Sequence, residues 1–399
     1  MIMRLHTIGE LSPSGVLDLG RRCPHSCQFC FYSFYDGSDD QFHYLRRAPW
    51  LETDKAKNVL KHFADWGLSH FDYTGGEPSL HPDIVEITRY AHNDLGLKGR
   101  MITLAQFLSN KPRKIARPLL DELLDAGLND FLFSFHSVDK ALFKQMTGGD
   151  LDKMLVTLDE LDKRDFSYCV NSVVNQHNYE TLPDTARHWV SRNIRIANFI
   201  MMRMDWGLRE QPGVAINHKG NYEIVTQYVK EAIDILDAAG IAVNVRYAPY
   251  CSFKGYERHL VGYKGIQLDP YEWRNGTLAA SEGTPWLKSK TVEDYYRNRV
   301  PVFENDPVYN LGFADKCENC ALRSICDGVD LNYIKTYGWE EFQPYAGEKV
   351  HDIVHFRRDY PGPFLMKEEQ YEHHDCGCHH QEPATDTQTV PRPPFCVGE

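Results

Sequence analysis

The sequence lacks the features of a membrane-spanning or secreted protein. No apolar run reaches the 18 residues or so that a membrane-spanning helix needs, and the opening residues Met1–His6 lack the apolar core of a signal peptide. Internal repeats and coiled-coil heptads are absent as well. We therefore expect a soluble, cytoplasmic protein with no membrane partner.

Positive charge is also in short supply. The chain has 44 Lys and Arg against 56 Asp and Glu, which gives a formal net charge of -12. This balance disfavours nonspecific binding to RNA, DNA or anionic lipid, and it suits a neutral or cationic substrate. We expect no nucleic-acid partner.

Cysteine, in contrast, is abundant, with 11 residues in 399. In a reducing compartment such a count indicates metal binding or catalysis rather than disulfides. The densest group is Cys23, Cys27 and Cys30, spaced C-x3-C-x2-C. Three thiolates on one loop can hold three irons of a 4Fe-4S cluster and leave the fourth open for chemistry. The alternatives are a partial disulfide set and a zinc site, for which the nearby His25 and His43 are poorly placed to complete a tetrahedron.

A second motif, Gly75-Gly76-Glu77-Pro78, follows the next predicted strand. Paired glycines let a backbone approach a ligand closely, and the carboxylate of Glu77 can accept hydrogen bonds from an ammonium group. A Gly-Gly turn alone is common at the end of a strand. Because it follows the cysteine loop at the end of the next predicted strand, the motif is more specific than a Gly-Gly turn alone.

The cysteine spacing, Phe29 before the last cysteine and the Gly-Gly-Glu-Pro segment together resemble the signatures of the radical S-adenosylmethionine (radical SAM) superfamily. The resemblance implies that the open iron binds S-adenosylmethionine and that an electron from the cluster cleaves it to a 5'-deoxyadenosyl radical. It also implies that Gly75, Gly76 and Glu77 contact the amino group of the cofactor. We expect an electron donor such as flavodoxin or ferredoxin.

From residue 14 to about 250, short apolar runs alternate with amphipathic segments of helical length, which predicts a parallel α/β sheet. The predicted strands are 15–20, 69–74, 98–104, 130–135, 166–174, 196–203 and 242–247. The predicted helices are 53–67, 81–95, 112–127, 139–164, 178–192 and 221–239. Six or so βα units are too few for a closed barrel, in agreement with the superfamily's partial TIM barrel. We predict a partial (β/α)6 TIM barrel over residues 1–248, with the cofactor at the carboxyl ends of the strands.

Residues 249–365 are predicted to form a small C-terminal auxiliary-cluster domain. Its cysteines, Cys317, Cys320 and Cys326, have a C-x2-C-x5-C spacing that resembles SPASM and twitch domains, which bind auxiliary 4Fe-4S clusters. A full SPASM run would place a further cysteine at position 330, which is Asp330 here. We therefore expect one auxiliary 4Fe-4S cluster, with structural zinc as the alternative.

By resemblance to the twitch type, Cys251 is the expected fourth ligand of the auxiliary cluster. The competing possibilities are Cys376, Cys378, Cys396 and an open iron that meets the substrate. Residues 366–399 have few apolar residues and are expected to be a disordered tail. Their His and Cys residues form either an adventitious metal site or a third true one.

Three further residues lie on or just after predicted strands where the cofactor would bind. By resemblance, Ser134 or His136 contacts its ribose or carboxylate. Asn171 is a cofactor contact, a substrate contact or a satisfied hydrogen bond within the barrel.

Two more strand residues are candidates for catalysis or binding. Cys169 is either a hydrogen-atom donor in catalysis or core packing. Arg203 offers a fork for a carboxylate or phosphate.

We expect an enzyme that abstracts a hydrogen atom from a small molecule such as a sugar, aminoglycoside or nucleoside, leading to oxidation, epimerisation or rearrangement. An auxiliary cluster that accepts an electron would make it oxidoreductase-like. A peptide-modifying SPASM-type maturation enzyme is the alternative, disfavoured because the 22 residues before Cys23 are too few for the recognition domain many of them carry. A non-catalytic iron-sulfur electron carrier is the alternative of another class, and it would not need the carboxylate of Glu77.

Overall fold

The computed structural model describes residues 14–30, 32, 42–65, 67–109, 117–202, 222–262, 271, 278–280, 311–352 and 355–357. Within these residues, nine strands form one parallel sheet in the order β8-β7-β6-β5-β4-β3-β2-β1-β9. The strands are β1 (Ser14–Asp18), β2 (His70–Thr74), β3 (Lys98–Thr103), β4 (Asp130–Ser134), β5 (Tyr168–Val174), β6 (Ile194–Met201), β7 (Ala242–Arg246), β8 (Leu260–Val261) and β9 (Leu278–Ala280).

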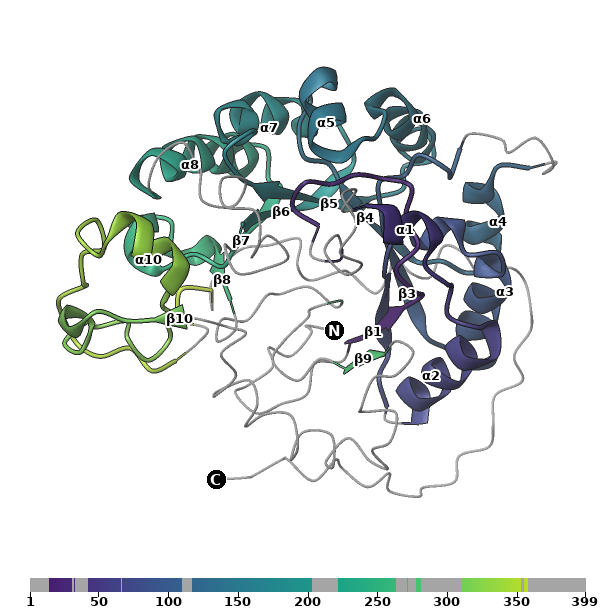
Figure 1. Ribbon diagram of the computed structural model, residues 1–399, viewed down its shortest axis with the longest axis horizontal. Coiled ribbons are helices and arrows are strands. Elements are labelled where there is room, and N and C mark those ends of the chain that lie inside the picture. The colour runs from purple at the N-terminus through teal and green to yellow at the C-terminus, as the bar shows by residue number, and fades with distance from the viewer. Residues whose placement is uncertain are drawn as a thin grey trace.

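Helices cover the outer face of this curved sheet (Figure 1). They are α2 (Thr53–Asp65), α3 (Ile84–Arg89), α4 (Leu119–Asp125), α5 (Lys140–Thr147), α6 (Leu151–Asp162), α7 (Leu182–Val190) and α8 (Tyr222–Ala238). The short helix α1 (His43–Arg47) lies between β1 and α2 in the chain. Parallel strands need such crossover helices, because the chain must return to the same end of the sheet. The sheet runs as an open arc whose edge strands are β8 and β9. This confirms the predicted α/β fold and partial barrel.

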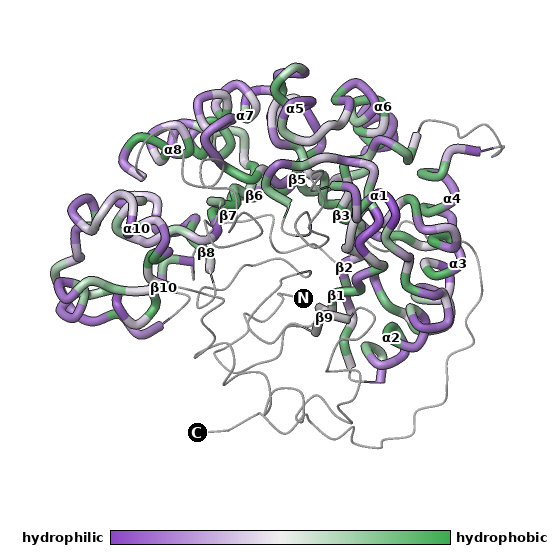
Figure 2. The backbone as a smooth tube through the Cα atoms, viewed as in Figure 1, coloured by the Kyte–Doolittle hydropathy of each residue, from purple (hydrophilic) through white to green (hydrophobic). Residues whose placement is uncertain are grey.

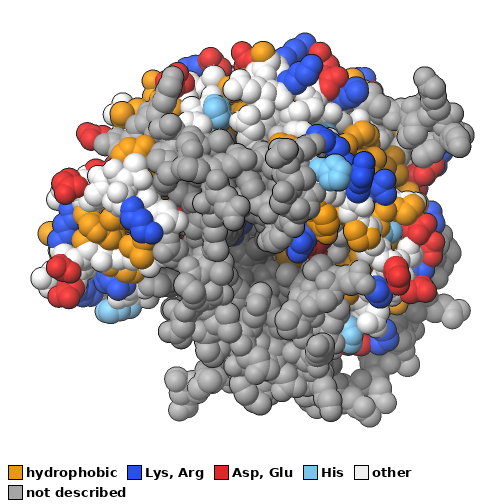
Figure 3. All heavy atoms as spheres, viewed as in Figure 1, with side chains coloured by type: hydrophobic (Ala, Val, Ile, Leu, Met, Phe, Trp, Pro, Cys, Tyr) orange, Lys and Arg blue, Asp and Glu red, His pale blue; other side chains and the backbone are white. Residues whose placement is uncertain are grey.

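Amphipathic helices hold the outer layer in place. In α2, the buried residues Ala56, Val59, Leu60 and Phe63 recur at the helical spacing and face the sheet. Stretches of apolar and polar residues alternate along the helices in Figure 2. Charged side chains lie on the outer rim in the space-filling view (Figure 3). No helix in the described part of the chain is long and apolar enough to cross a bilayer.

The predicted helix over 139–164 is wrong in one respect, because two helices occupy it. Gly148 ends α5 in the left-handed conformation, with φ +67°, and α6 starts after Asp150. Glycine adopts this conformation at little cost, so it commonly ends a helix. The break matters because the end of α5 contacts the cysteine loop.

A smaller unit follows the barrel in the chain. It contains the antiparallel pair β10 (Leu311–Gly312) and β11 (Val329–Asp330) and the helix α10 (Leu331–Tyr337). Two strands beyond residue 248, β8 and β9, join the barrel sheet itself. The predicted division at residue 248 stays a prediction.

Candidate active site

The loop with Cys23, Cys27 and Cys30 leaves the carboxyl end of β1 and is tied down on several sides. At its base, Asp18 accepts hydrogen bonds from the Gly20 amide (2.9 Å) and the Tyr32 hydroxyl (2.8 Å). The Cys23 amide donates to the Leu45 carbonyl of α1 at 2.8 Å. These bonds position the three thiols before any ligand binds.

The end of α5 holds the other side of the loop. The Ser26 amide donates to the Thr147 carbonyl at 2.8 Å, and the Gln28 amide donates to the Met146 carbonyl at 2.9 Å. Both carbonyls belong to the last turn of the helix, where no later helical amide is available to them. The loop amides therefore satisfy groups that the helix end leaves open.

Gly75 and Gly76 dock the end of β2 against the same loop. The Gly76 amide donates to the Gly20 carbonyl (2.8 Å), and the Glu77 amide donates to the Arg22 carbonyl (2.9 Å). A Cβ at Gly76 would lie 2.1 Å from the Arg22 carbonyl oxygen, and Gly75 has φ +124°. The two glycines therefore bring the Gly-Gly-Glu motif and the cysteine loop together.

The Glu77 carboxylate is buried, 2% exposed, and well supplied with donors. One oxygen accepts hydrogen bonds from Ser79 and from the Thr103 hydroxyl (2.6 Å). The other accepts from the Leu104 amide (3.2 Å) and lies 3.9 Å from His25 Nε2. Glu77 thus connects the ends of β2 and β3 beside the cysteine loop. Its contact with a cofactor ammonium stays a prediction.

The three thiols are crowded in a way that suits a metal cluster. Burial raises the pKa of the Cys23 thiol, and the charges of Glu77 and Cys30 raise it further. Burial also raises the pKa of Cys27 well above its usual value, and the charges of Cys30 and Cys23 raise it further. Such thiols become thiolates only when a cation compensates them, and coordinated iron does this. The donor set therefore fits the cluster that the spacing implies.

His136 lies beside the cysteine loop, two residues after Ser134, which ends β4. The His136 ring meets the Phe29 ring edge-on, with centroids 4.7 Å apart. Its Nδ1 accepts the Val173 amide at 3.1 Å, and burial lowers the pKa of His136 to about 3. His136 is therefore neutral at pH 7, and Ser134 is half-buried beside it.

The inner face of the sheet is layered. Leu132, Cys169, Ile196 and Ala242 pair in register across β4 to β7 and form a buried apolar cluster. Cys169 is fully buried in that layer, a placement that favours packing. Its role as a hydrogen-atom donor stays a prediction.

One polar layer follows toward the carboxyl ends of the strands. There Ser134 pairs with Asn171, Asn171 with Asn198, and Asn198 with Asn244. We call Asn171, Asn198 and Asn244 the amide row. Asn244 Nδ2 donates to Asn198 Oδ1 at 2.9 Å, and Arg357 Nη2 donates to Asn244 Oδ1 at 2.8 Å.

The sequence did not single out two members of the amide row, Asn198 and Asn244, or Arg357, which bonds to the row. Asn198 and Asn244 lie on predicted strands, and their polar character among apolar neighbours was the available signal. Arg357 had none, because it lies 113 positions from Asn244 in the chain. Arg203, by contrast, lies outside the described residues, as do Cys376, Cys378 and Cys396.

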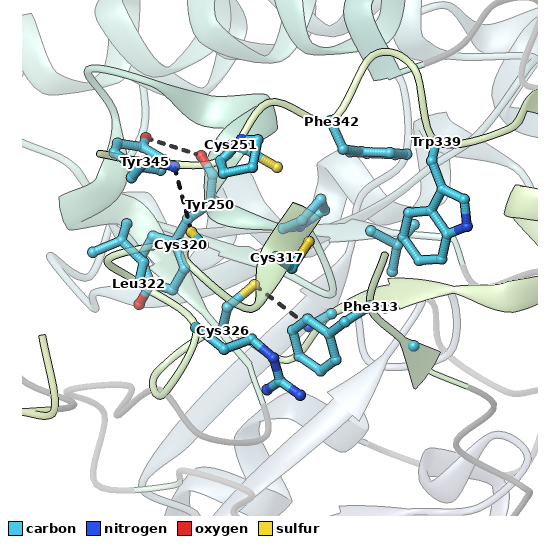
Figure 4. A pocket seen from close by; sticks show the side chains of 16 residues that line it. Tyr250, Cys251, Phe313, Cys317, Cys320, Leu322, Cys326, Trp339, Phe342 and Tyr345 are labelled. Carbon is cyan, nitrogen blue, oxygen red and sulfur yellow. Dashed lines mark hydrogen bonds between the residues drawn. The ribbon is translucent and has the colours of Figure 1, made fainter. Parts of the chain in front are cut away.

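A second group of cysteines lines a pocket in the C-terminal unit. Cys251, Cys317, Cys320 and Cys326 all face it, together with aromatic residues such as Phe313, Trp339 and Tyr345. Figure 4 shows the four sulfur atoms around one space. Burial raises the pKa of Cys251 to about 12, and the charges of Cys326 and Cys317 add to this effect. The structure therefore brings Cys251 to the trio.

Backbone amides point at two of these sulfurs. The Tyr345 amide donates to Cys320 Sγ, and the Gly328 amide donates to Cys326 Sγ, each at 3.4 Å. Asp330 instead faces its own helix, where its carboxylate accepts the Asn332 amide (2.8 Å) and caps α10. Position 330 therefore serves helix capping.

Among the described residues, no group of three His, Cys, Asp or Glu side chains is arranged to hold a metal ion. A four-iron cluster makes a different demand, because each thiolate binds its own iron. The absence of a single-ion site in the described part of the chain therefore does not bear on whether either cysteine group can hold a cluster.

The family comparison covers the barrel. Residues 17–188 match the model described as the radical SAM superfamily. A PqqA peptide cyclase from Bradyrhizobium diazoefficiens is 31% identical over 171 residues, which cover 42% of this chain and 41% of that protein. Another from Xanthomonas euvesicatoria pv. vesicatoria is 28% identical over 203 residues, 50% of each protein. The chain spans about half the length of the curated relatives it matches.

Solved structures share the fold. Streptococcus suis SuiB, bound to its precursor peptide SuiA, superposes with a TM-score of 0.54 at 16% identity and covers 86% of this chain and 75% of that one. The protein anSMEcpe, with bound AdoMet and Cp18Cys peptide, has a TM-score of 0.52 at 13% identity, covering 82% and 95%.

These relatives correct the expected substrate. The matched cyclases are named for a peptide, which contradicts the expectation of a small-molecule substrate. That expectation relied on the short segment before Cys23, and the length of that segment is a poor guide to substrate class.

The matched region begins in β1, contains both the cysteine loop and the Gly-Gly-Glu motif, and ends in α7. Because motif, geometry and family model agree over these residues, residues 17–188 form a radical SAM domain.

Proposed function

We propose that this radical SAM enzyme modifies a peptide. The observation that carries the proposal is that relatives sharing its barrel are named as cyclases of a peptide. The similarity of fold to SuiB, solved with a precursor peptide, is consistent with it.

A radical SAM domain implies a 4Fe-4S cluster and S-adenosylmethionine, and we assign the cluster to Cys23, Cys27 and Cys30. Bound together, they supply a 5'-deoxyadenosyl radical after one-electron reduction. We propose a flavodoxin or ferredoxin as the source of that electron. Docking of the loop on Gly76, Leu45 and Thr147 supports the assignment, because these contacts fix the thiols in place.

The chain's own residues prepare the space in which such a radical would act. The apolar layer around Leu132 and Cys169 closes the floor of the barrel to water. Neutral His136 and half-buried Ser134 lie at the rim beside the loop and are our candidates for cofactor contacts. Glu77, Gly75 and Gly76 complete this group.

We further propose that Cys251, Cys317, Cys320 and Cys326 hold one auxiliary 4Fe-4S cluster. Four thiols facing one pocket are the complete ligand set for such a cluster. A peptide that gave a hydrogen atom to the adenosyl radical would then have to lose one electron and one proton to reach a neutral, closed-shell oxidised product, with the proton passing to solvent. An acceptor in this pocket, next to β7, would make the net reaction a two-electron oxidation.

The proposal is tested with anaerobically reconstituted protein, S-adenosylmethionine and reductant. Short peptides encoded near the gene, with synthetic PqqA peptide as a reference, are incubated and analysed by mass spectrometry. We expect one peptide to change mass, and no change with a variant in which Cys23, Cys27 and Cys30 are alanine. If sugars or nucleosides were altered while every peptide kept its mass, the proposal would be wrong.

A further inference from the structure

The amide row spans the inner face of the barrel between the two cysteine sites. Next to Asn171, the carboxyl end of β4 places His136 against Phe29 of the first cysteine loop. At its other end, Asn244 bonds to Arg357, whose neighbour Phe356 packs on Tyr250 of the second cysteine pocket, with ring centroids 5.7 Å apart. The row therefore connects the surroundings of the first cysteine loop with those of the second cysteine pocket.

Arg357 fixes which way the side-chain amides of the row point. It is 2% exposed, and a guanidinium can only donate hydrogen bonds. Asn244 must therefore turn its oxygen toward Arg357 and its amide nitrogen toward Asn198. Asn198 receives that bond on its oxygen, so its own amide nitrogen lies on the side away from Asn244.

Asn171, the next member of the row, has an unused acceptor. Its side-chain oxygen is buried and has no hydrogen-bond partner among the described residues, and the residue is 8% exposed. Buried polar atoms are nearly always paired in native proteins, so this oxygen indicates a donor that arrives with a ligand. With Asn198, the row offers one acceptor and one donor on adjacent strands.

We propose that the amide row, oriented by Arg357, binds a peptide group of the substrate. Asn171 Oδ1 accepts a backbone N–H, and Asn198 Nδ2 donates to a backbone carbonyl. Peptide groups pair with carboxamides because each carries one donor and one acceptor face. This inference rests on the proposed function and names its substrate-binding residues, with Arg357 as a positioning residue.

Asn244→Asp tests whether the orientation of the side-chain amides in the row matters for binding. The new carboxylate still accepts from Arg357 but cannot donate, so Asn198 must reverse its amide and present oxygen beside the oxygen of Asn171. We expect the KM for the peptide that changes mass in the assay above to rise at least tenfold. The affinity for S-adenosylmethionine, measured by equilibrium dialysis, should stay within twofold of the wild type.

Arg357 variants give a graded test. Arg357→Lys keeps a donor and should raise the peptide KM less than Arg357→Met, which frees the orientation of Asn244. As a matched control, Asn332→Asp on α10 keeps its bond from Lys335 and should behave like the wild type. Iron content and melting temperature identify any variant that fails to fold. If Asn244→Asp fails to fold, Arg357→Lys provides the test instead.

A wild-type peptide KM in Asn244→Asp would overturn the inference. A tenfold loss of S-adenosylmethionine affinity would also overturn it, because the row would then serve the cofactor. Failure of the proposed function is separate, since it shows in the wild-type protein as cofactor cleavage with no change in any peptide.

Discussion

At the scale of single residues, Gly76 shows how little space separates the two motifs of the active site. A Cβ there would meet the carbonyl oxygens of Arg22 at 2.1 Å and Arg21 at 2.6 Å. Both are backbone atoms, which cannot move aside as a flexible side chain would. The glycine is therefore required for the close contact between β2 and the cysteine loop.

We expect Gly76→Ala to displace the cysteine loop. The iron retained at Cys23, Cys27 and Cys30 should fall, and 5'-deoxyadenosine formation should fall at least tenfold. Iron analysis and chromatography measure both. Gly255→Ala is the control, because a Cβ there has nothing within 4 Å, although its φ of +84° adds a small strain. Full activity in Gly76→Ala would show that the contact is dispensable.

His136 gives a prediction about pH. Its pKa is lowered from 6.5 to about 3 by burial, so the unfolded chain binds a proton first as the pH falls below 6.5. The stability contributed by neutral His136 is present above pH 6.5 and is lost as the pH falls toward 3. The loss reaches about 1.4 kcal/mol per pH unit.

The variant His136→Asn keeps an acceptor for the Val173 amide but does not titrate. Between pH 7 and pH 5, the wild type should lose about 2 kcal/mol more unfolding free energy than the variant. Denaturant unfolding of the reconstituted protein at each pH measures this difference. Equal losses in the two proteins would mean that His136 is not held neutral.

At the scale of elements, the helix cap at Asp330 explains why this position is not a cysteine. The sequence predicted one auxiliary cluster because this position is not cysteine. The structure supplies a reason for the aspartate, since its carboxylate accepts the Asn332 amide and starts α10. A carboxylate at a helix N-cap is among the preferred choices.

Asp330→Cys therefore should not create a further cluster. We expect unchanged iron content and a loss of about 1 kcal/mol in stability, because the cap is removed. Asp330→Ser keeps a capping oxygen and serves as the control. A gain of about four irons in the cysteine variant would contradict this view of position 330.

Some elements could be predicted from the sequence and some could not. The strand predicted at 98–104 agrees with Lys98–Thr103, because a buried strand between two helical segments is a strong local pattern. The helix predicted at 139–164 overlooked Gly148, whose left-handed conformation ends α5. The glycine is a local signal for the end of this helix, and the prediction did not use it.

At the scale of the whole molecule, the sites depend on residues that are distant in the chain. Both cysteine groups could be recognised from their spacing. Cys251 lines the second pocket, and its role as a cluster ligand stays a prediction. The amide row could not be recognised, because strand register is set by packing across the sheet. The contact of Arg357 with Asn244 has no local signature at all.

The two cysteine sites should be separable. Replacing Cys317, Cys320 and Cys326 by alanine should lower the iron content from about eight to about four per chain. Cofactor cleavage without peptide should survive, because the first loop is held by its own contacts, whereas peptide modification should stop. Iron analysis and the mass of the peptide report the two effects. Unchanged iron content would exclude the auxiliary cluster.

The most direct test of the central claim is 5'-deoxyadenosine formation by the anaerobic, reconstituted protein with S-adenosylmethionine and reductant. The wild type should produce it, and a variant with Cys23, Cys27 and Cys30 replaced by alanine should produce none above background. Equal production by the two proteins would contradict the assignment of these three cysteines to radical chemistry.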